Sequence, residues 1–170
     1  RENEIQKYFE VNYPNIVVIF SNYNYNSFLH KYDDFKELDK QLDINIKGVT
    51  KVISNSLKSM RDNGYGRIIW ASSITVDKKV AGTSIYSSVK SYYESIVKNV
   101  CLENARKGIT ANCIQLGYMD GGLTYTLSED FRKKVINSIP SKRLGKISEI
   151  SETINFLINN SYVNGSVVKL

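Results

Sequence analysis

Three side chains that could move a proton occur close together in the sequence: Ser73, Tyr86 and Lys90. Tyr86 and Lys90 are four residues apart, so on a helix they would project from one face. A free tyrosine has a pKa of about 10, and a nearby ammonium stabilises the phenolate and lowers that pKa. Tyr86 is therefore a candidate general acid or base, and the Ser73 hydroxyl is a candidate hydrogen-bond donor to the same carbonyl oxygen.

The segments around these residues predict how they are brought together. The apolar run Ile68–Ala71 is typical of a buried strand in a parallel sheet. Ser73 would lie just past the carboxyl end of that strand, where open α/β sheets bind their ligands. Tyr86 and Lys90 would follow on a helix that covers residues 83–105. A tyrosine packed on a sheet beside a solvated lysine is the alternative interpretation, because Y-x-x-x-K alone is common by chance.

The rest of the chain alternates between strand-like and helix-like segments, which predicts a single α/β domain with a parallel sheet. The run NIVVIF at 15–20 is the most strand-like, because it is continuous and rich in β-branched residues. We expect strands to begin near Asn15, Arg67, Ile109 and Gly165. We expect helices at 4–11, 34–63, 83–105 and 128–138, and from Ser148 or Ser151 to Asn159.

Composition excludes several classes of function. The formal net charge is +6, but the lysines are scattered and no basic run reaches five residues. We therefore interpret the charge as solvated surface and expect no nucleic-acid partner. No apolar run approaches the roughly 20 residues that cross a bilayer, so we expect no membrane segment. The N-terminal sequence RENEIQK does not have the pattern of a signal peptide, and we expect a cytoplasmic protein.

The cysteines and the histidine do not predict a metal site or a disulfide. Cys101 and Cys113 fall in a predicted helix and a predicted strand, which favours reduced, buried thiols. Neither they nor His30, the only histidine, have the spacing of metal ligands.

A serine followed thirteen residues later by Y-x-x-x-K resembles the active-site pattern of the short-chain dehydrogenase/reductase family. The resemblance extends to GRII at 66–69 and to the family segment G-I-x-x-N-x-I-x-P-G, in which Asn112 and Gly117 are in place and Leu116 replaces the proline. The segments GRII and IPSKRLGK look most like the 3-oxoacyl-[acyl-carrier-protein] reductase branch, which serves fatty acid or polyketide biosynthesis.

The resemblance implies an NAD(P)-dependent oxidoreductase that reduces a carbonyl, such as that of a 3-oxoacyl thioester, on a small or carrier-bound substrate. Tyr86 would exchange the proton, Lys90 would lower the pKa of Tyr86 and bind the nicotinamide ribose, and Ser73 would polarise the carbonyl. Asn45 lies in a matching N-x-x-G segment with Gly48, where the family's asparagine holds a relay water. Without the resemblance, a polar helix residue such as Asn45 would be interpreted as solvated.

The same resemblance suggests further contacts with the cofactor, NADP or NAD. Gly117 is one of them. The family's N-N-A-G turn beside the adenosine corresponds to residues 19–22. Here only Ser21, which is small, and Asn22, which tolerates a positive φ, keep the character of that turn. The threonine that contacts the nicotinamide carboxamide is replaced by Gly121 or Gly122.

The glycine-rich turn T-G-x-x-x-G-x-G, which holds the cofactor pyrophosphate in the family, does not occur in this sequence. The resemblance therefore covers only strands 4-5-6-7 of the family order 3-2-1-4-5-6-7, in a three-layer Rossmann-like fold. The strand at 15–20 would then be an exposed edge. A longer chain, a second polypeptide, or a role as a non-catalytic partner could each explain it.

Two functions remain open from the sequence. The first is the reductase. The second is a non-catalytic or half-site subunit that needs a partner chain to complete the cofactor site. In either case the resemblance implies a homo- or hetero-oligomer, formed through the helices at 34–63 and 84–105.

Overall fold

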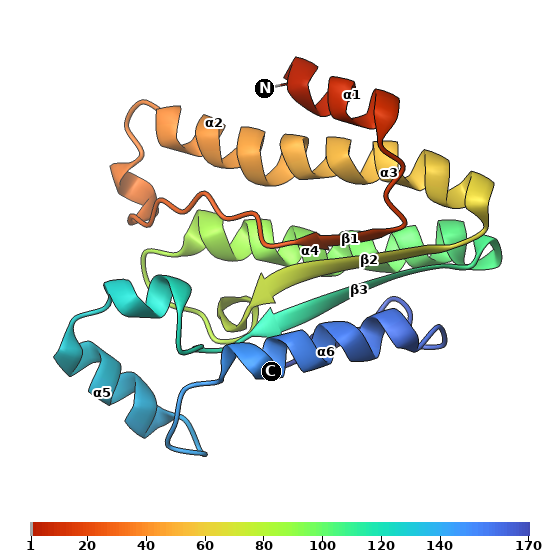
Figure 1. The fold of residues 1–170 in the computed structure, drawn as a ribbon. Helices are drawn as coiled ribbons and strands as arrows, with labels where there is room; N and C mark the ends of the chain where they lie inside the picture. Colours follow the sequence, from red (N-terminus) through yellow and green to blue (C-terminus); the bar gives the residue numbers. More distant parts are fainter. Residues whose placement is uncertain (1) are drawn as a thin grey trace.

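Four parallel strands form one sheet in the order β1-β2-β3-β4 in a computed structural model that describes residues 2–170, apart from the side chains of residues 2, 3 and 6. Ile16 of β1 is in register with Arg67 of β2, and Gly66 of β2 with Ile109 of β3. Figure 1 shows β1, β2 and β3 side by side. Their bounds are Ile16–Ile19 (β1), Gly66–Ser73 (β2), Ile109–Leu116 (β3) and Val167–Lys169 (β4). The predicted class and strand order are confirmed.

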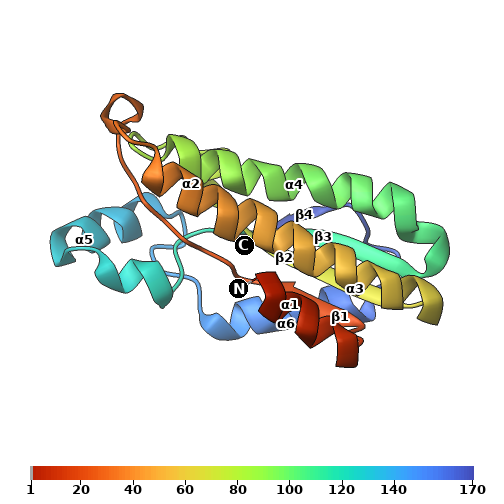
Figure 2. The ribbon, with the colours of Figure 1, turned by 90° about the horizontal axis from the view of Figure 1, so that it is seen from above.

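Helices cover both faces of this sheet, which makes three layers (Figures 1 and 2). Helices α3 and α4 pack on one face and α6 packs on the other. Helix α1 lies outside α3, and α5 lies beyond the carboxyl ends of the strands. The bounds are Glu2–Val11 (α1), Lys36–Leu42 (α2), Val49–Asn63 (α3), Ser84–Asn104 (α4), Glu129–Ser138 (α5) and Ile147–Asn159 (α6).

The two faces of β2 supply two hydrophobic clusters. Ile68 and Trp70 face α3 and α4, whereas Ile69 packs with Ile114 and with Leu157 of α6. All eight residues of β2 are buried. Burial on both faces explains why this strand is a continuous apolar run rather than an alternating one.

The helix expected at 34–63 is interrupted. It begins at Lys36, after Phe35 in the left-handed conformation, and it ends as predicted at Gly64, which has φ +65°. Between α2 and α3 the chain forms a π-helical turn, Asp43–Gly48, which contains Asn45. Such turns are rare inside helices and often occur at functional sites.

Strand β1 is an edge of the sheet, as expected. Ile16 and Val18 are 43% and 37% exposed, and Phe20, just after the strand, is 50% exposed. A groove of about 1070 Å³ runs beside this strand, between it and the segment from α2 to α3. An apolar, β-branched edge of this kind can pair with another strand.

Candidate active site

A cavity of about 470 Å³ opens at the carboxyl ends of the strands. Five of the predicted site residues line it: Asn22 after β1, Ser73 at the end of β2, Tyr86 and Lys90 on α4, and Gly117 after β3. Its volume lies in the usual range for small-molecule sites. The parallel topology therefore brings together residues that are up to 95 positions apart in the sequence.

The environment of Tyr86 differs from the sequence prediction. Burial raises the pKa of Tyr86 above its ordinary value of 10.0, and a hydrogen bond with Ser73 only partly opposes that rise. The prediction that Lys90 lowers the pKa of Tyr86 is wrong. The Lys90 Nζ lies 5.6 Å from the centre of the Tyr86 ring and donates its hydrogen bonds to main-chain carbonyl oxygens instead. A phenol with a raised pKa is protonated at neutral pH and can donate its proton.

Lys90 is buried beneath the cavity. Its Nζ donates to the carbonyl oxygens of Ala71, at 3.1 Å, and Ser21, at 3.3 Å. Burial lowers the pKa of Lys90 from 10.5 to about 8, although the nearby Cys113 raises it slightly. Lys90 is thus charged at neutral pH but sits close to its titration point.

Ser73 is held so that its own proton stays available. Its Oγ accepts hydrogen bonds from the Thr75 amide, at 3.3 Å, and from the Thr75 hydroxyl, at 3.1 Å. Since the oxygen already accepts two bonds, the hydroxyl proton is free to be donated to Tyr86 or to a ligand oxygen at the cavity.

Asn45 and Ser21 lie behind the cavity rather than in its wall. The Asn45 side chain accepts from the Ser21 hydroxyl and the Tyr23 amide, and it donates to the Tyr23 carbonyl. Asn45 is 2% exposed, so it is not the solvated polar residue of the alternative interpretation. It reaches Lys90 only through Ser21, whose carbonyl oxygen accepts from Lys90.

The loop after β3 forms the opposite wall. The Gly117 amide donates to the Leu170 carbonyl at 2.8 Å. A Cβ at Gly117 would lie 3.1 Å from that oxygen. Thr124, which is buried and lines the cavity, was missed in the sequence. It brings a hydroxyl near the place where Gly121 and Gly122 lack one, and no motif in the sequence pointed to it.

Asn22 lines the cavity, but the positive φ that was expected for it from the sequence is not observed. Among the described residues other than glycine, only Phe35 and Lys142 have a positive φ. Asn22 therefore keeps its predicted place without the predicted backbone conformation.

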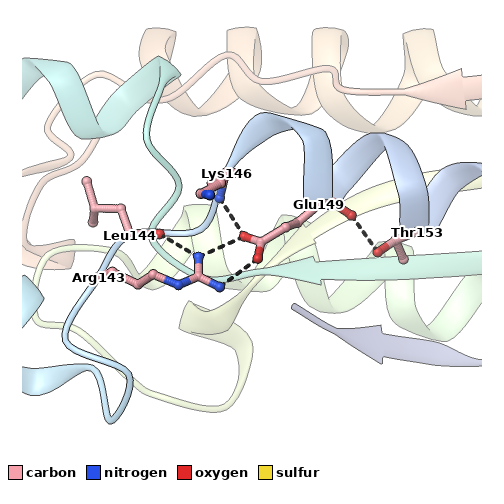
Figure 3. Close-up of polar contacts among 5 residues, drawn as sticks. All are labelled: Arg143, Leu144, Lys146, Glu149 and Thr153. Atoms are coloured by element: carbon pink, nitrogen blue, oxygen red, sulfur yellow. Dashed lines mark hydrogen bonds and ion pairs between the residues drawn. The ribbon is translucent and has the colours of Figure 1, made fainter.

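The start of α6, which closes the cavity with Ile147, Ile150 and Ile154, is fixed by a polar network (Figure 3). Arg143 donates to both carboxylate oxygens of Glu149, at 2.9 and 2.6 Å. The Arg143 bonds lower the pKa of Glu149 to about 2, so the carboxylate stays ionised. It also accepts from the Lys146 amide at 2.7 Å.

Neither cysteine lines this cavity. Both cysteines are free, and Cys113 is buried whereas Cys101 is partly exposed. Among residues 2–170, no group of three or more His, Cys, Asp or Glu side chains could hold a metal ion. Within the same residues, no helix combines the length and apolar character needed to cross a bilayer.

The cavity fits the reacting end of a nicotinamide cofactor. It offers a protonated phenol, a buried cation, a close-approach glycine main chain and the hydroxyls of Ser73 and Thr124. A glycine-rich turn that could hold the pyrophosphate is not part of the sequence. The fit therefore concerns the nicotinamide side of the cofactor alone.

Comparison with known proteins gives the family. The family model described as enoyl-(acyl carrier protein) reductase matches residues 16–170. An acetoacetyl-CoA reductase from Synechocystis sp. is 33% identical over 135 residues, which cover 78% of this chain and 56% of that protein. A 3-oxoacyl-[acyl-carrier-protein] reductase from Buchnera aphidicola is 35% identical over 129 residues, 75% of this chain and 53% of that protein. The chain belongs to the short-chain dehydrogenase/reductase family.

A third relative shows the same partial coverage. Nodulation protein G from Azospirillum brasilense is 32% identical over 139 residues, 81% of this chain and 56% of that protein. The chain thus spans about half the length of the curated relatives that it matches.

Proposed function

We propose that this chain carries the proton-donating half of an NAD(P)-dependent reductase that converts a carbonyl to an alcohol. The observation that carries the proposal is the convergence of Ser73, Tyr86 and Lys90 on one cavity at the carboxyl ends of the strands. A nicotinamide cofactor, when bound, supplies or accepts hydride in this chemistry. Proton transfer and polarisation of the carbonyl fall to residues of this chain.

The roles follow from the contacts of each group. The Tyr86 phenol, whose pKa is raised by burial, gives its proton to the oxygen that becomes the alcohol. Ser73 donates a hydrogen bond to the same oxygen, because its own oxygen is occupied by Thr75. The Ser73 hydrogen bond, which lowers the pKa of Tyr86 against the effect of burial, also stabilises the negative charge left on the phenolate. Asn45 accepts a hydrogen bond from the Ser21 hydroxyl. The family resemblance implies that it also holds a relay water.

The remaining predicted contacts concern the cofactor. Gly117, which lines the cavity, lets the main chain approach the nicotinamide, as the family resemblance implies. Lys90 binds the nicotinamide ribose, Asn22 contacts the cofactor from the β1 side, and Ser21 does so indirectly through the Lys90 contact. The proposal does not distinguish NAD from NADP, because the family segment that reads the 2′ position of the adenosine ribose has no counterpart in this sequence.

A 3-oxoacyl thioester is the substrate class we favour. Acetoacetyl-CoA is itself a 3-oxoacyl thioester, so the two reductases at 33% and 35% identity are named for the same reacting group. The cavity suits the 3-oxo group and its neighbouring carbons, because Leu116, Met119, Leu123 and Ile150 give it apolar walls. The thioester carrier would extend out of the cavity.

A second function is favoured by the exposed edge of the sheet. Strand β1, with Ile16 and Val18 partly exposed beside a groove of about 1070 Å³, presents unpaired backbone groups to any further strand. In this candidate the chain is a half-site subunit, and another polypeptide completes the sheet and the pyrophosphate site. Association through helices 34–63 and 84–105 is compatible with both functions.

Two titrations test these functions. NADPH is added to the purified chain, and energy transfer from Trp70, the only tryptophan, to the reduced nicotinamide reports binding. An acetoacetyl thioester is then added and the loss of NADPH absorbance is followed. Binding and consumption by the chain support the reductase. If the chain neither binds nor consumes NADPH until a second chain is added, the half-site subunit is supported. If NADPH is neither bound nor consumed, with or without the second chain, both functions are refuted.

A further inference from the structure

The Lys90 ammonium lies between two tyrosine rings of its own helix. Its Nζ is 5.6 Å from the ring centre of Tyr86, on the cavity side, and 4.9 Å from that of Tyr93. Tyr93 is fully buried and is stacked on Trp70, with 6.5 Å between ring centres. A ring at this distance attracts a cation, and the attraction is stronger away from water.

The Tyr93 hydroxyl contacts the π-helical turn. It donates to the Asn45 carbonyl oxygen at 2.8 Å. Burial raises the pKa of Tyr93, which keeps the phenol protonated and able to donate. The carbonyl oxygens of a π-helical turn are displaced from the regular helical pattern, and an external donor satisfies this one.

Together these contacts form a closed series through Tyr93, Asn45, Ser21 and Lys90, which we call the circuit. Asn45, held by Tyr93 through its main chain, accepts from the Ser21 hydroxyl at 3.3 Å through its side chain. The Ser21 carbonyl in turn accepts from the Lys90 ammonium at 3.3 Å. Tyr93 and Lys90 are three residues apart on α4, so one helix holds both ends of the circuit. Removing the Tyr93 hydroxyl would release the segment that presents an acceptor to Lys90.

We propose that Tyr93 is a positioning residue for Lys90: its ring face holds the ammonium, and its hydroxyl fixes the Asn45 turn that presents the Ser21 carbonyl to that ammonium. The proposal rests on the proposed function only in that Lys90 serves catalysis. The geometry of the circuit exists without cofactor or substrate. Tyr93 itself does not line the cavity and acts through Lys90.

Tyr92 provides a matched control. It is the next residue on α4, and its hydroxyl bonds to the Thr50 hydroxyl of α3 at 2.6 Å. Tyr92→Phe therefore also removes a phenol hydrogen bond between α4 and the α2–α3 region, but it leaves the circuit intact. A general loosening of the helix contacts would affect both variants alike.

The test is the pKa of Lys90 in the cofactor-free chain, followed by the ¹³Cε chemical shift of labelled lysine. The groups that face Lys90 are Tyr86 and Tyr93 on α4 and Cys113 on β3, and all three are unchanged by the control. Loss of an acceptor that favours the charged form lowers a lysine pKa, so Tyr93→Phe is expected to lower it by about one pKa unit. Tyr92→Phe is expected to leave it unchanged.

Ser21→Ala cuts the same circuit at its other end and keeps the proposal testable if Tyr93→Phe does not fold. It is expected to lower the pKa of Lys90 in the same direction. An unchanged or raised pKa of Lys90 in either folded variant, or an equal shift in Tyr92→Phe, overturns the proposal. Because no cofactor is present, these results do not depend on whether the chain is a reductase.

Discussion

Lys90 is expected to destabilise the fold that it serves, and Lys90→Met tests this. Burial lowers the pKa of Lys90 from 10.5 to about 8, so below pH 8 the folded chain must hold a charge that the unfolded chain holds more easily. The difference between the two pKa values corresponds to about 3 kcal/mol at about 1.4 kcal/mol per pKa unit. Methionine keeps the length of the side chain and removes the charge.

The direction of the Lys90 pKa shift determines the pH range in which the free energy of unfolding changes. Between about pH 8 and 10.5 the unfolded lysine is protonated and the folded one is neutral, so the unfolded state binds more protons and wild-type stability rises with pH. The stability advantage of Lys90→Met over wild type is therefore largest below pH 8. It is expected to shrink by about 2 kcal/mol between pH 7 and pH 9.5.

Urea denaturation at a series of pH values, followed by circular dichroism, measures that advantage. The buried acids Tyr86, Tyr93 and Cys113 are present in both proteins, so their titration largely cancels in the difference. The change of the difference with pH also removes any constant contribution from packing. Two stability curves that stay parallel from pH 7 to pH 9.5 would refute the reasoning, because Lys90 would then titrate near its ordinary pKa.

Two further predictions concern Ser73 and the turns that end helices. Ser73→Ala removes the hydrogen bond that opposes the effect of burial, so it should raise the pKa of Tyr86 further, measured by NMR of ¹³Cζ-labelled tyrosine; a lower pKa would contradict the assigned bond. Gly108→Ala places a Cβ 2.3 Å from the Gly64 carbonyl oxygen at a φ of +70°, and it should cost more than about 2 kcal/mol of unfolding free energy. Gly64→Ala, at φ +65° with open space around it, is the control and should cost about 1 kcal/mol; equal losses would show that the contact is unimportant.

The strands, and the meeting of Ser73, Tyr86 and Lys90 at one cavity, were predictable because local patterns determine them. NIVVIF and the run Ile68–Ala71 are apolar and β-branched, so they are strands in nearly any context that buries them. The spacing from Ser73 to Tyr86 and Lys90 predicted that these side chains lie close together, since a parallel sheet brings the carboxyl ends of its strands to one edge. The order of the four strands followed from the resemblance, and the structure confirms it.

The electrostatics of the site were not predictable from spacing. Four residues on a helix place Lys90 on the same face as Tyr86, but the flexible lysine side chain reaches the carbonyl oxygens of Ser21 and Ala71 instead of the phenol. Burial, which decides the direction of the Tyr86 pKa, depends on the whole fold. The spacing therefore predicted that Ser73, Tyr86 and Lys90 share one cavity, but it predicted the wrong direction for the shift of the Tyr86 pKa.

The π-helical turn and its partner were also beyond the sequence. From helix propensity alone, Asn45 is interpreted as a solvated residue of a regular helix at 34–63, because propensity does not distinguish a π-helical turn from a polar surface position. No motif in the sequence distinguishes Tyr93 from the other buried positions of α4, such as Val89 and Val97. Its hydrogen bond to Asn45 joins residues 48 positions apart, and only the packing of α4 against that turn reveals it.

The most direct test of the account is the effect of Tyr86→Phe on the reduction of an acetoacetyl thioester by NADPH. It is made on the chain alone or with a second chain, whichever binds NADPH, and Tyr92→Phe is the control. Because a positioned general acid contributes about a hundredfold or more, Tyr86→Phe should lower the rate by at least that factor, whereas Tyr92→Phe should retain the wild-type rate. Equal rates for Tyr86→Phe and wild type would contradict the proposal that Tyr86 donates the proton.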